Sequence, residues 1–456
     1  MKKKNDILSR LFGKEHRPQE NKHNQPADAD SGKSSDAGKG GGTGSVPGSD
    51  SGASGEAHYS DHNHNIAPDH TEDKYPRNGK DGKPEVDLSS GKYTKVWQGP
   101  NHPGVTGNMS LELTICGDEI VDAKTHVGYL HRGFEKLFER RLYMQVMPTC
   151  LRMCVPESDT NEYVFSEAVE ELSGIEAPEK AKWLRMLVLE MSRLQMLLRV
   201  VPGQGGAFGL GIGVQWGMYV RELILDLFEE LTGGRIYHMY MLPGGVRGDL
   251  PEGFRERAIK TMDEVYRFAQ RIDDVMFNNS VFKKRATGTG YIDPSWVDRF
   301  GIVGPNARAA GYNRDVRKDH PYLLYDQLEW EVPVLEKSDV YTRARIRWMD
   351  MQVTADLIKQ ILNKIPEKGS FKAPTPNALN WRIPRGETYV KAEASRGEFG
   401  YYVVSDGSAY PRRITLRGPS YTHAIALLEK MLIRTNIADV GAIMVSLQTC
   451  PPEIER

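Results

Sequence analysis

The chain has 456 residues, of which 39% are hydrophobic and 27% are charged, and its formal net charge is -1. This length is enough for one large domain or for two to three smaller ones. The balanced charge gives no electrostatic reason to expect nucleic acid or an anionic membrane as a partner. Four cysteines are too few for a disulfide framework in a chain of this length, and they suit a reducing compartment.

The first part of the chain differs in composition from the rest. Residues 1–90 are rich in Gly, Ser, Asp, Asn, Lys and His and contain almost no large apolar side chains. Such a segment cannot offset the entropy of its ordering by burial, so we predict a disordered tail over 1–90 and a globular domain over 91–456. No stretch approaches the roughly 18–20 apolar residues of a spanning helix, and the basic start lacks the apolar run of a secretory signal. We therefore expect a cytoplasmic protein, free or docked to something larger.

Hydrophobic periodicity predicts the elements of the globular part in chain order. A period of two predicts a hairpin of 110–115 and 120–124 around a Gly-Asp turn. Apolar residues at helical spacing predict helices over 181–201, 220–231, 254–275, 346–361 and 421–435. Before the last helix, 389–394, 400–408 and 413–417 predict a small antiparallel sheet with an Asp-Gly turn. The predicted fold class is α+β, a bundle of long helices with small antiparallel sheet regions.

One short stretch gathers groups that carry chemistry. A thiol, two carboxylates, an amide and an arginine lie just upstream of a helix that we expect to begin near Tyr163, and so near its positive end. These residues are Arg152, Cys154, Glu157, Asp159 and Asn161. The chain ends on Cys450-Pro-Pro-Glu453, which repeats the Cys-x-Pro-Glu pattern of Cys154 to Glu157. From the spacing alone, a shared site and a chance repeat with packed cysteines both stay open.

Several long motifs in a fixed order resemble one known family. They are Gly99-Pro-Asn-His-Pro, Val127-Gly-Tyr-Leu-His-Arg-Gly-Phe-Glu-Lys, Glu190-Met-Ser-Arg-Leu, Asp226-Leu-Phe-Glu, Gly244-Gly-Val, Asp315-Val-Arg-Lys and Glu393-Ala-Ser-Arg-Gly-Glu-Phe-Gly-Tyr-Tyr-Val-Val-Ser-Asp-Gly. From about Gly99 to Arg456 the chain resembles the 49 kDa proteins, or D subunits, of respiratory complex I. That family shares a superfamily with the large subunits of nickel-iron hydrogenases, so the resemblance implies a hydrogenase large-subunit-like fold.

The resemblance also implies an acceptor pocket, and here the chain departs from the family pattern. Complex I proteins usually carry a second histidine in the Gly-Pro-x-His-Pro loop that holds the quinone headgroup, where this chain has Thr106. They place a quinone-binding tyrosine three residues before the Ala-Val-Glu of the next helix, where this chain has Phe165, with Tyr163 close by. An ordinary ubiquinone reductase is therefore disfavoured. The candidate acceptor-binding residues are His102, Thr106, Tyr129, His131, Asn161 and Phe165.

A second departure concerns metal binding. Nickel-iron hydrogenases hold their metals with two Cys-x-x-Cys pairs, one early and one in the final residues. Cys154 and Cys450 correspond to the first cysteine of each pair, while Glu157 and Glu453 replace the second. Because the missing cysteines are the ones that bridge nickel to iron, we expect no nickel-iron centre and assign no metal ligands. The pattern resembles the hydrogenase-related subunits of membrane-bound sulfane reductases.

The resemblance implies a role within a larger complex. We expect an active-site subunit of a membrane-associated, ion-translocating, NADH dehydrogenase-like oxidoreductase, a class linked to quinone and NAD binding. It would receive electrons from an iron-sulfur cluster in a partner of the small, B-like type, beside a C-like protein and membrane-arm subunits, on the cytoplasmic side of the cell membrane. The acceptor is a quinone-like carrier or a polysulfide.

The predicted chemistry assigns roles to both halves of the repeat. Cys154 and Cys450 would exchange with polysulfide, with their thiolates stabilised by Arg152. Glu157, Asp159 and Glu453 are the predicted proton donors. Three alternatives stay open: an orthodox D subunit of NADH-quinone oxidoreductase with altered quinone contacts, an atypical hydrogenase large subunit, and a non-catalytic coupling scaffold.

Overall fold

The computed structural model describes residues 86–102 and 107–456. Of the predicted disordered tail, only residues 86–90 are among the described residues. Thr106 lies outside the described residues. Within 86–90 the chain forms one 3-10 turn, Leu88–Ser90, in which the Asp87 carboxylate accepts a hydrogen bond from the Ser89 amide at 2.9 Å. Regular structure thus begins slightly before the predicted boundary.

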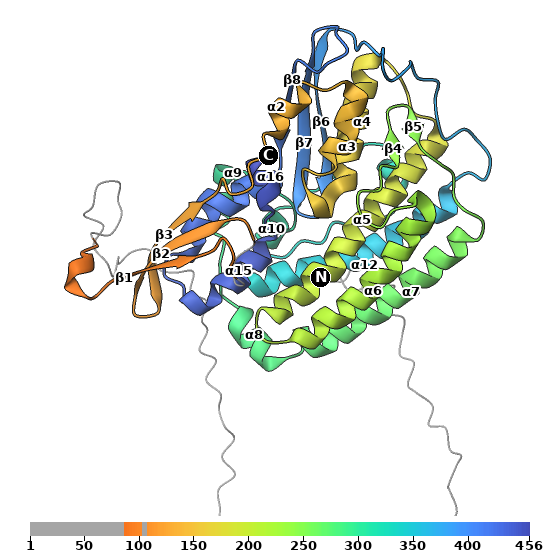
Figure 1. Cartoon of the computed structure of the whole chain (residues 1–456). Coiled ribbons are helices and arrows are strands. Elements are labelled where there is room, and N and C mark those ends of the chain that lie inside the picture. Colours follow the sequence, from red (N-terminus) through yellow and green to blue (C-terminus); the bar gives the residue numbers. More distant parts are fainter. Residues whose placement is uncertain (1–85, 103–106) are drawn as a thin grey trace, which may run out of the picture. The chain divides into compact units, whose positions relative to one another are not determined.

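The four long helices predicted from periodicity are confirmed; three have longer bounds, and α7 ends at Ile272 instead of 275. They are α5 Glu179–Gly206, α6 Gly211–Thr232, α7 Phe254–Ile272 and α12 Val340–Lys364. α5 packs against both α6 and α12, and α7 packs against the same two helices (Figure 1). The predicted stripe on α5, which includes Leu187 and Leu194, is completely buried. Each such side chain contributes about 1.5–3 kcal/mol of burial free energy, so packing holds the bundle.

Two antiparallel sheets flank this bundle. The first contains β1 Thr94–Gln98, β2 Ser110–Cys116 and β3 Glu119–His126, in that order, and confirms the predicted hairpin with its Gly117-Asp118 turn. The second contains β6 Gly386–Ala394, β7 Gly397–Ser405 and β8 Arg413–Arg417. β6 and β7 lie against α4, Ser158–Ser173 (Figure 1). β4 Met241–Leu242 pairs with β5 Gly245–Val246.

Shorter helices complete the described part of the chain. The α-helices are α2 Phe134–Phe138, α3 Tyr143–Cys150, α8 Ser280–Ala286, α9 Ser295–Phe300, α10 Gly304–Ala309, α11 Val316–Asp319, α15 Val440–Leu447 and α16 Pro451–Glu455. The 3-10 helices are η3 Val155–Glu157, η5 Tyr325–Gln327 and η7 Ile437–Asp439, and η4 Asp273–Phe277 is a π-helix. None of the helices in the described ranges is long and apolar enough to cross a bilayer.

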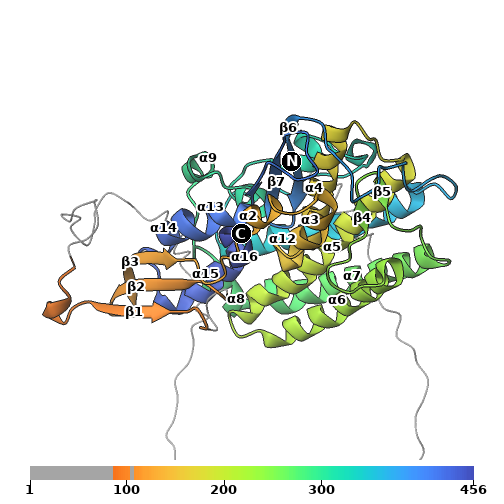
Figure 2. The same cartoon turned by 45° about the horizontal axis from the view of Figure 1, so that its top comes forward.

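Three predicted boundaries are wrong. α4 begins at Ser158 rather than near Tyr163, because the chain turns into it directly from η3. The last predicted helix begins at Pro419, whose missing amide suits a first helical turn. It runs as α13 Pro419–Thr422, the wider turn η6 His423–Leu427 and α14 Leu428–Leu432, and α14 packs against β3 (Figure 2). This last helix ends at Leu432 instead of the predicted 435. The predicted Asp-Gly turn, Asp406-Gly407, does lie in the connection from β7 to β8, and the tight turn between β6 and β7 consists of Ser395 and Arg396.

That tight turn is fixed by a close backbone approach. Gly397 has a φ of +128°, and a Cβ on it would meet Val303 Cγ2 at 2.6 Å and the Gly304 amide nitrogen at 2.8 Å. Only glycine adopts this conformation without strain and leaves room for the neighbouring chain. The close approach therefore sets where Arg396 stands.

Replacing Gly397 with alanine is expected to destabilise the fold by roughly 2–4 kcal/mol, the sum of backbone strain and overpacking. The measurement is the midpoint of thermal unfolding of the purified complex. Gly407→Ala is the matched control, because Gly407 also has a positive φ, +92°, but nothing within 4 Å of the added Cβ. An equal loss in both variants would show that packing at the turn is unimportant.

Candidate active site

The two Cys-x-Pro-Glu segments adopt the same local structure. Cys154 has φ −132° and ψ 101°, and Cys450 has φ −129° and ψ 100°. Each cysteine precedes a helical turn with proline in its first positions, and each carbonyl accepts from the amide of the glutamate three residues later at 3.1 Å. The repeated sequence therefore produces a repeated turn that presents a thiol and a carboxylate together.

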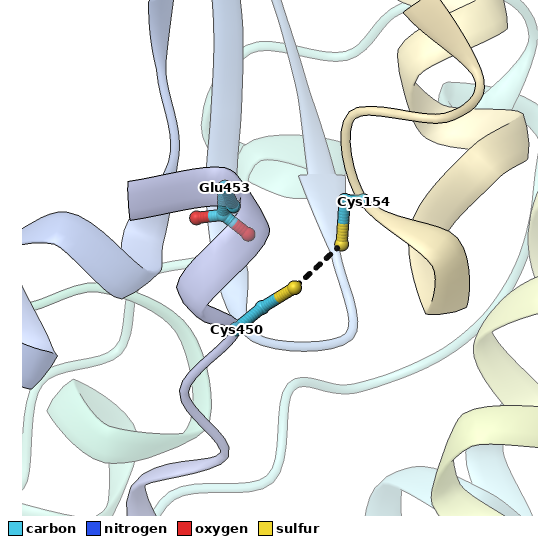
Figure 3. Close-up of side chains that lie close together, drawn as sticks. All are labelled: Cys154, Cys450 and Glu453. Atoms are coloured by element: carbon cyan, nitrogen blue, oxygen red, sulfur yellow. Dashed lines mark hydrogen bonds between the residues drawn. The ribbon is translucent and has the colours of Figure 1, made fainter. Parts of the chain in front are cut away.

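The two turns meet in space. Cys154 Sγ and Cys450 Sγ are 3.4 Å apart although 296 positions separate them along the chain (Figure 3). Cys154 comes from the loop before α4, and Cys450 comes from the start of α16 (Figure 3). Both thiols are free, and their residues are 0% and 7% exposed. The geometry thus brings together the pair of cysteines that the sequence proposed for a shared site.

A third element supplies the charge at this site. Arg396, in the β6–β7 turn, donates from Nη2 to Cys154 Sγ at 2.6 Å. Its Nη1 lies 3.0 Å from Glu453 Oε2, and its Nε lies 3.7 Å from Glu157 Oε1. The guanidinium is 1% exposed, so one buried cation contacts a thiol and both carboxylates. Sequence reasoning missed Arg396, although the Glu393 motif contains it.

Backbone and hydroxyl groups hold the two carboxylates. Glu157 Oε1 accepts from the Ser395 amide at 3.0 Å and from the Ser395 hydroxyl, and Gln448 Nε2 donates to that hydroxyl at 3.0 Å. Glu453 Oε1 accepts from the Ser420 amide at 2.8 Å. Each glutamate is thus oriented by a serine amide. Sequence reasoning missed both serines, although the Glu393 motif contains Ser395, because their contacts with the glutamates arise only from the packing of separate elements.

The two thiols titrate as one unit. Burial and the hydrogen bond with Cys450 hold the pKa of Cys154 well above its ordinary value. The hydrogen bond from Cys154 lowers the pKa of Cys450 to about 7, and the positive charge of Arg396 contributes in the same direction. Near neutral pH the pair therefore gives up one proton and shares the other between its sulfurs. A thiol-thiolate pair of this kind contains the nucleophilic form of cysteine.

The remaining predicted chemical residues lie elsewhere. Arg152 is exposed, donates to the carbonyl of Pro148 and stands 4.9 Å above the ring of Tyr237. The predicted contact of Arg152 with the thiols is therefore wrong. Asp159 is buried and pairs with His238 at 2.7 Å between Oδ1 and Nδ1. Arg396 makes the contact with the thiol that was predicted for Arg152, because the β6–β7 turn reaches the cysteines.

The burial of the acids has electrostatic consequences. Burial raises the pKa of Glu157, against the opposing charge of Arg396. Burial lowers the pKa of His238, but the negative charge of Asp159 outweighs it and the pKa is raised overall. Glu157 is therefore able to hold a proton next to the thiols, whereas Asp159 acts within its pair with His238.

The predicted acceptor-binding residues fall into separate places. Asn161 donates from Nδ2 to the Glu157 carbonyl at 2.8 Å and accepts from the Tyr401 hydroxyl at 2.6 Å, so it supports the motif. Phe165 is buried in α4 beside the ring of Tyr401, at 6.5 Å between centroids. His102 is exposed at the edge of the described residues.

The loop with Tyr129 and His131 lies next to the cysteine site. Tyr129 is 49% exposed, and its hydroxyl accepts from Ser110 Oγ at 2.8 Å. His131 Nδ1 donates to the Glu455 carbonyl at 2.6 Å, and the Leu130 amide donates to the Glu455 carboxylate. Because Glu455 belongs to α16, this loop is fixed to the helix that carries Cys450.

The site has the donor types of a small metal centre but an unfavourable charge. One ligand atom each from Cys154, Cys450 and Glu453 lies within 4.8 Å of the others (Figure 3). Arg396 contacts two of these three residues, and its fixed positive charge repels a cation placed between them. The residues present do not fit a nickel-iron centre, because Glu157 and Glu453 stand where bridging thiolates are needed.

Comparison with known proteins identifies the family of the chain. The family described as respiratory-chain NADH dehydrogenase, 49 Kd subunit, matches residues 208–381 and 375–456. The D subunit of NADH-quinone oxidoreductase from Thermosipho melanesiensis is 40% identical over 79% of this chain and 99% of the relative. The D subunit of F(420)H(2) dehydrogenase from Methanosarcina mazei is 35% identical over 79% of this chain and 97% of the relative.

A solved structure extends the comparison to the fold. A chain of the membrane-bound sulfane sulfur reductase, an archaeal respiratory membrane complex, is 39% identical and superposes with a TM-score of 0.78 over 81% of this chain and 100% of that chain. The predicted hydrogenase-related α+β fold is thereby confirmed. The chain belongs to the 49 kDa family of the respiratory-chain NADH dehydrogenases, the D subunits of complex I-like and related respiratory membrane complexes.

Proposed function

We propose that this protein reduces a sulfur acceptor, a polysulfide or sulfane sulfur, at the Cys154–Cys450 pair. The observation that carries the proposal is the 3.4 Å approach of two free thiols beside the Arg396 guanidinium. One thiol of such a pair can attack a sulfur-sulfur bond, and the second thiol can then attack the mixed disulfide that forms. The likeness to a sulfane sulfur reductase chain supports the same chemistry.

The reaction balances in three steps. The thiolate of the pair attacks the acceptor's sulfur-sulfur bond, forms a mixed disulfide and releases one reduced sulfur group as an anion. The second thiol then attacks the mixed disulfide, closes a Cys154–Cys450 disulfide and releases the other sulfur group. Two electrons, supplied by a partner protein, and one proton restore the thiol-thiolate pair. The sulfurs need to close from 3.4 Å to about 2 Å in the second step.

The groups around the pair support each step. Arg396 stabilises the thiolate by a direct hydrogen bond, and the same charge favours the leaving sulfur anion. Glu157 is buried beside the pair and suits proton donation, because its pKa is raised by burial. Glu453, held by the Ser420 amide and Arg396, balances the guanidinium charge.

The proposal includes the assembly in which the chain acts. Its electrons come from the iron-sulfur cluster of a small, B-like partner, and a C-like protein and membrane-arm subunits complete an ion-translocating complex on the cytoplasmic side of the membrane. Support comes from the family, whose relatives are named as subunits of respiratory oxidoreductases, and from the membrane-bound complex of the solved relative. The site works without a nickel-iron centre, because Arg396 stands against its thiol and carboxylate donors.

The test is to treat the purified complex with polysulfide in the absence of an electron donor. We expect mass spectrometry to find the peptides of Cys154 and Cys450 joined by a disulfide, with a mixed disulfide or persulfide on one of them at short times. Cys150, a buried thiol that donates to the Met147 carbonyl at 3.2 Å, should stay unmodified. Unmodified Cys154 and Cys450 together with quinone-dependent turnover would instead favour a quinone-like acceptor beside Tyr129 and His131.

A further inference from the structure

The β6–β7 hairpin also lines a polar cavity. It has a volume of about 530 Å³ and is lined by residues of α9, α10, α11 and the second sheet. Two ion pairs stand among its lining residues, Lys391–Glu398 at 3.1 Å and Arg417–Glu398 at 3.2 Å. Glu393 and Asp315 also line it, although they are only 4% and 2% exposed. The cavity thus reaches buried acids that the proposed reaction does not use.

Glu393 differs from the other acids of this cavity. Its Oε2 accepts from the Val316 amide at 3.1 Å, and its Oε1 lies 3.4 Å from Arg308 Nη1. Asp315 is paired more closely, with Arg317 at 2.8 Å and Arg308 at 3.1 Å. The charged and titratable groups around Glu393 are Arg193 from α5, Arg308 from α10, Asp315, Arg317 from α11, Tyr322, Lys391 and Glu398, its cross-strand partner on β7. Asp315 therefore holds the negative charge of the cluster, and Glu393 is the acid left to titrate.

The chain connects Glu393 directly to the cysteine site. Residues 393–396 run from the cavity to the thiols: Glu393 lines the cavity, Ser395 holds Glu157, and Arg396 contacts Cys154. Arg193 fixes the same segment by donating to the carbonyls of Glu393 and Ala394, the latter at 3.0 Å. The positive charge of Arg193 acts to lower the pKa of both Glu157 and Glu393, against the effect of their burial.

We propose that Glu393 is a proton-loading residue, which passes a proton towards Glu157 when the Cys154–Cys450 disulfide is reduced and regains one from the cavity. Reduction by two electrons leaves two thiolate charges. Arg396 balances one of them, and a proton has to neutralise the other. Glu393 supplies this proton from its side of the turn and is recharged by water in the cavity. This inference rests on the proposed function, because it needs a redox reaction at the cysteine pair.

The titration of Glu393 fits this role. Burial and the neighbouring charge of Asp315 raise the pKa of Glu393 to about 8, against the three surrounding arginines. The carboxyl is therefore mostly protonated at neutral pH and loses its proton as the pH rises through about 8. A donor with this pKa loses its proton on the alkaline side of the activity profile, which gives the inference a measurable signature.

The test uses the assembled complex with Glu393→Gln, and Asp298→Asn as the matched control, because Asp298 lines the same cavity but pairs only with the exposed Arg314 at 3.0 Å. We expect Glu393→Gln to lower turnover at pH 7 by about 10²-fold and to remove the alkaline fall in turnover near pH 8. Asp298→Asn should keep both. Glu393→Asp should restore part of the turnover if a carboxylic acid, and not merely shape, is required.

A second readout does not depend on the acceptor. Redox-difference infrared spectroscopy of the complex should show the carbonyl band of a protonated carboxylic acid that changes on reduction. The band should be present in the wild type and in Asp298→Asn and absent in Glu393→Gln. Turnover that persists in Glu393→Gln with an unchanged alkaline limb and an unchanged band would overturn the inference, while the cysteine chemistry would stand. Loss of the polysulfide-induced disulfide in the wild type would overturn the proposed function instead.

Discussion

Cys154→Ser and Cys450→Ser are each expected to reduce sulfur-acceptor turnover of the assembled complex by ~10³-fold or more, the scale on which loss of a nucleophile acts. Serine nearly matches cysteine in size, so the buried site keeps its packing. A hydroxyl, however, neither attacks sulfur as a thiolate does nor closes a disulfide. The measurement is steady-state turnover together with the protein composition of the complex, which separates lost chemistry from lost assembly.

The double variant is the sharper comparison. If the two sulfurs act as one unit, Cys154→Ser with Cys450→Ser should be little worse than either single change. Cys150→Ser is the control, since Cys150 is equally buried but donates to a backbone carbonyl away from the pair. Near-normal turnover in both single variants would contradict the proposed chemistry and leave these residues a structural role.

Arg396→Met is expected to have the second largest effect, on stability and on reactivity together. The guanidinium contacts Cys154, Glu157 and Glu453 in a site that is almost fully buried. Removing it leaves buried carboxylates without their cation, a change that typically costs about 3–5 kcal/mol. The measurements are the midpoint of thermal unfolding of the purified complex and its turnover. We expect the midpoint to fall and turnover to be reduced by at least ~10²-fold.

The same substitution should move the ionisation of the thiol pair. Arg396 contributes to holding the pKa of Cys450 at about 7, so without it the pKa should rise and the thiolate should form only at higher pH. Thiolate ultraviolet absorbance followed against pH reports this directly. Adding Glu453→Gln should recover part of the stability, because it removes the unpaired charge, but should not recover turnover.

An arginine in the same sheet serves as control for this series. Arg413 on β8 pairs with Glu135 and Glu139 at 3.0 Å each, but it is 46% exposed. Exposed pairs contribute about 0–1 kcal/mol, so Arg413→Met should leave both unfolding and thiol ionisation nearly unchanged. A loss of equal size in Arg413→Met would show that the Arg396 effect is not specific to the buried site.

Much of the fold is determined by local pattern. The four long helices follow from apolar residues at helical spacing, and the β2–β3 hairpin follows from alternation around Gly117-Asp118. The periodic pattern determines helix ends less well. α4 starts at Ser158, ahead of the expected Tyr163, because the preceding turn sets this boundary and the periodic stripe does not.

The sequence also determined the shape of each half of the site. The Cys-x-Pro-Glu pattern specifies a turn with an extended cysteine and proline in the first helical positions, and both copies adopt it with nearly the same dihedral angles. This is local physics, since proline restricts its own backbone and has no amide to lose. The pairing of Cys154 with Cys450 followed from the repeat and the family pattern together.

Only the tertiary structure decided which cation serves the thiols. Arg152 is close to Cys154 along the chain, yet it is exposed, while Arg396 reaches the sulfur from 242 positions away. The reason is that a side chain's neighbours in a packed core depend on which elements meet, here the β6–β7 turn, η3 and α16. Sequence proximity orders residues along one element, but it does not determine how separate elements dock, and the buried charge balance of this site is set entirely by that docking.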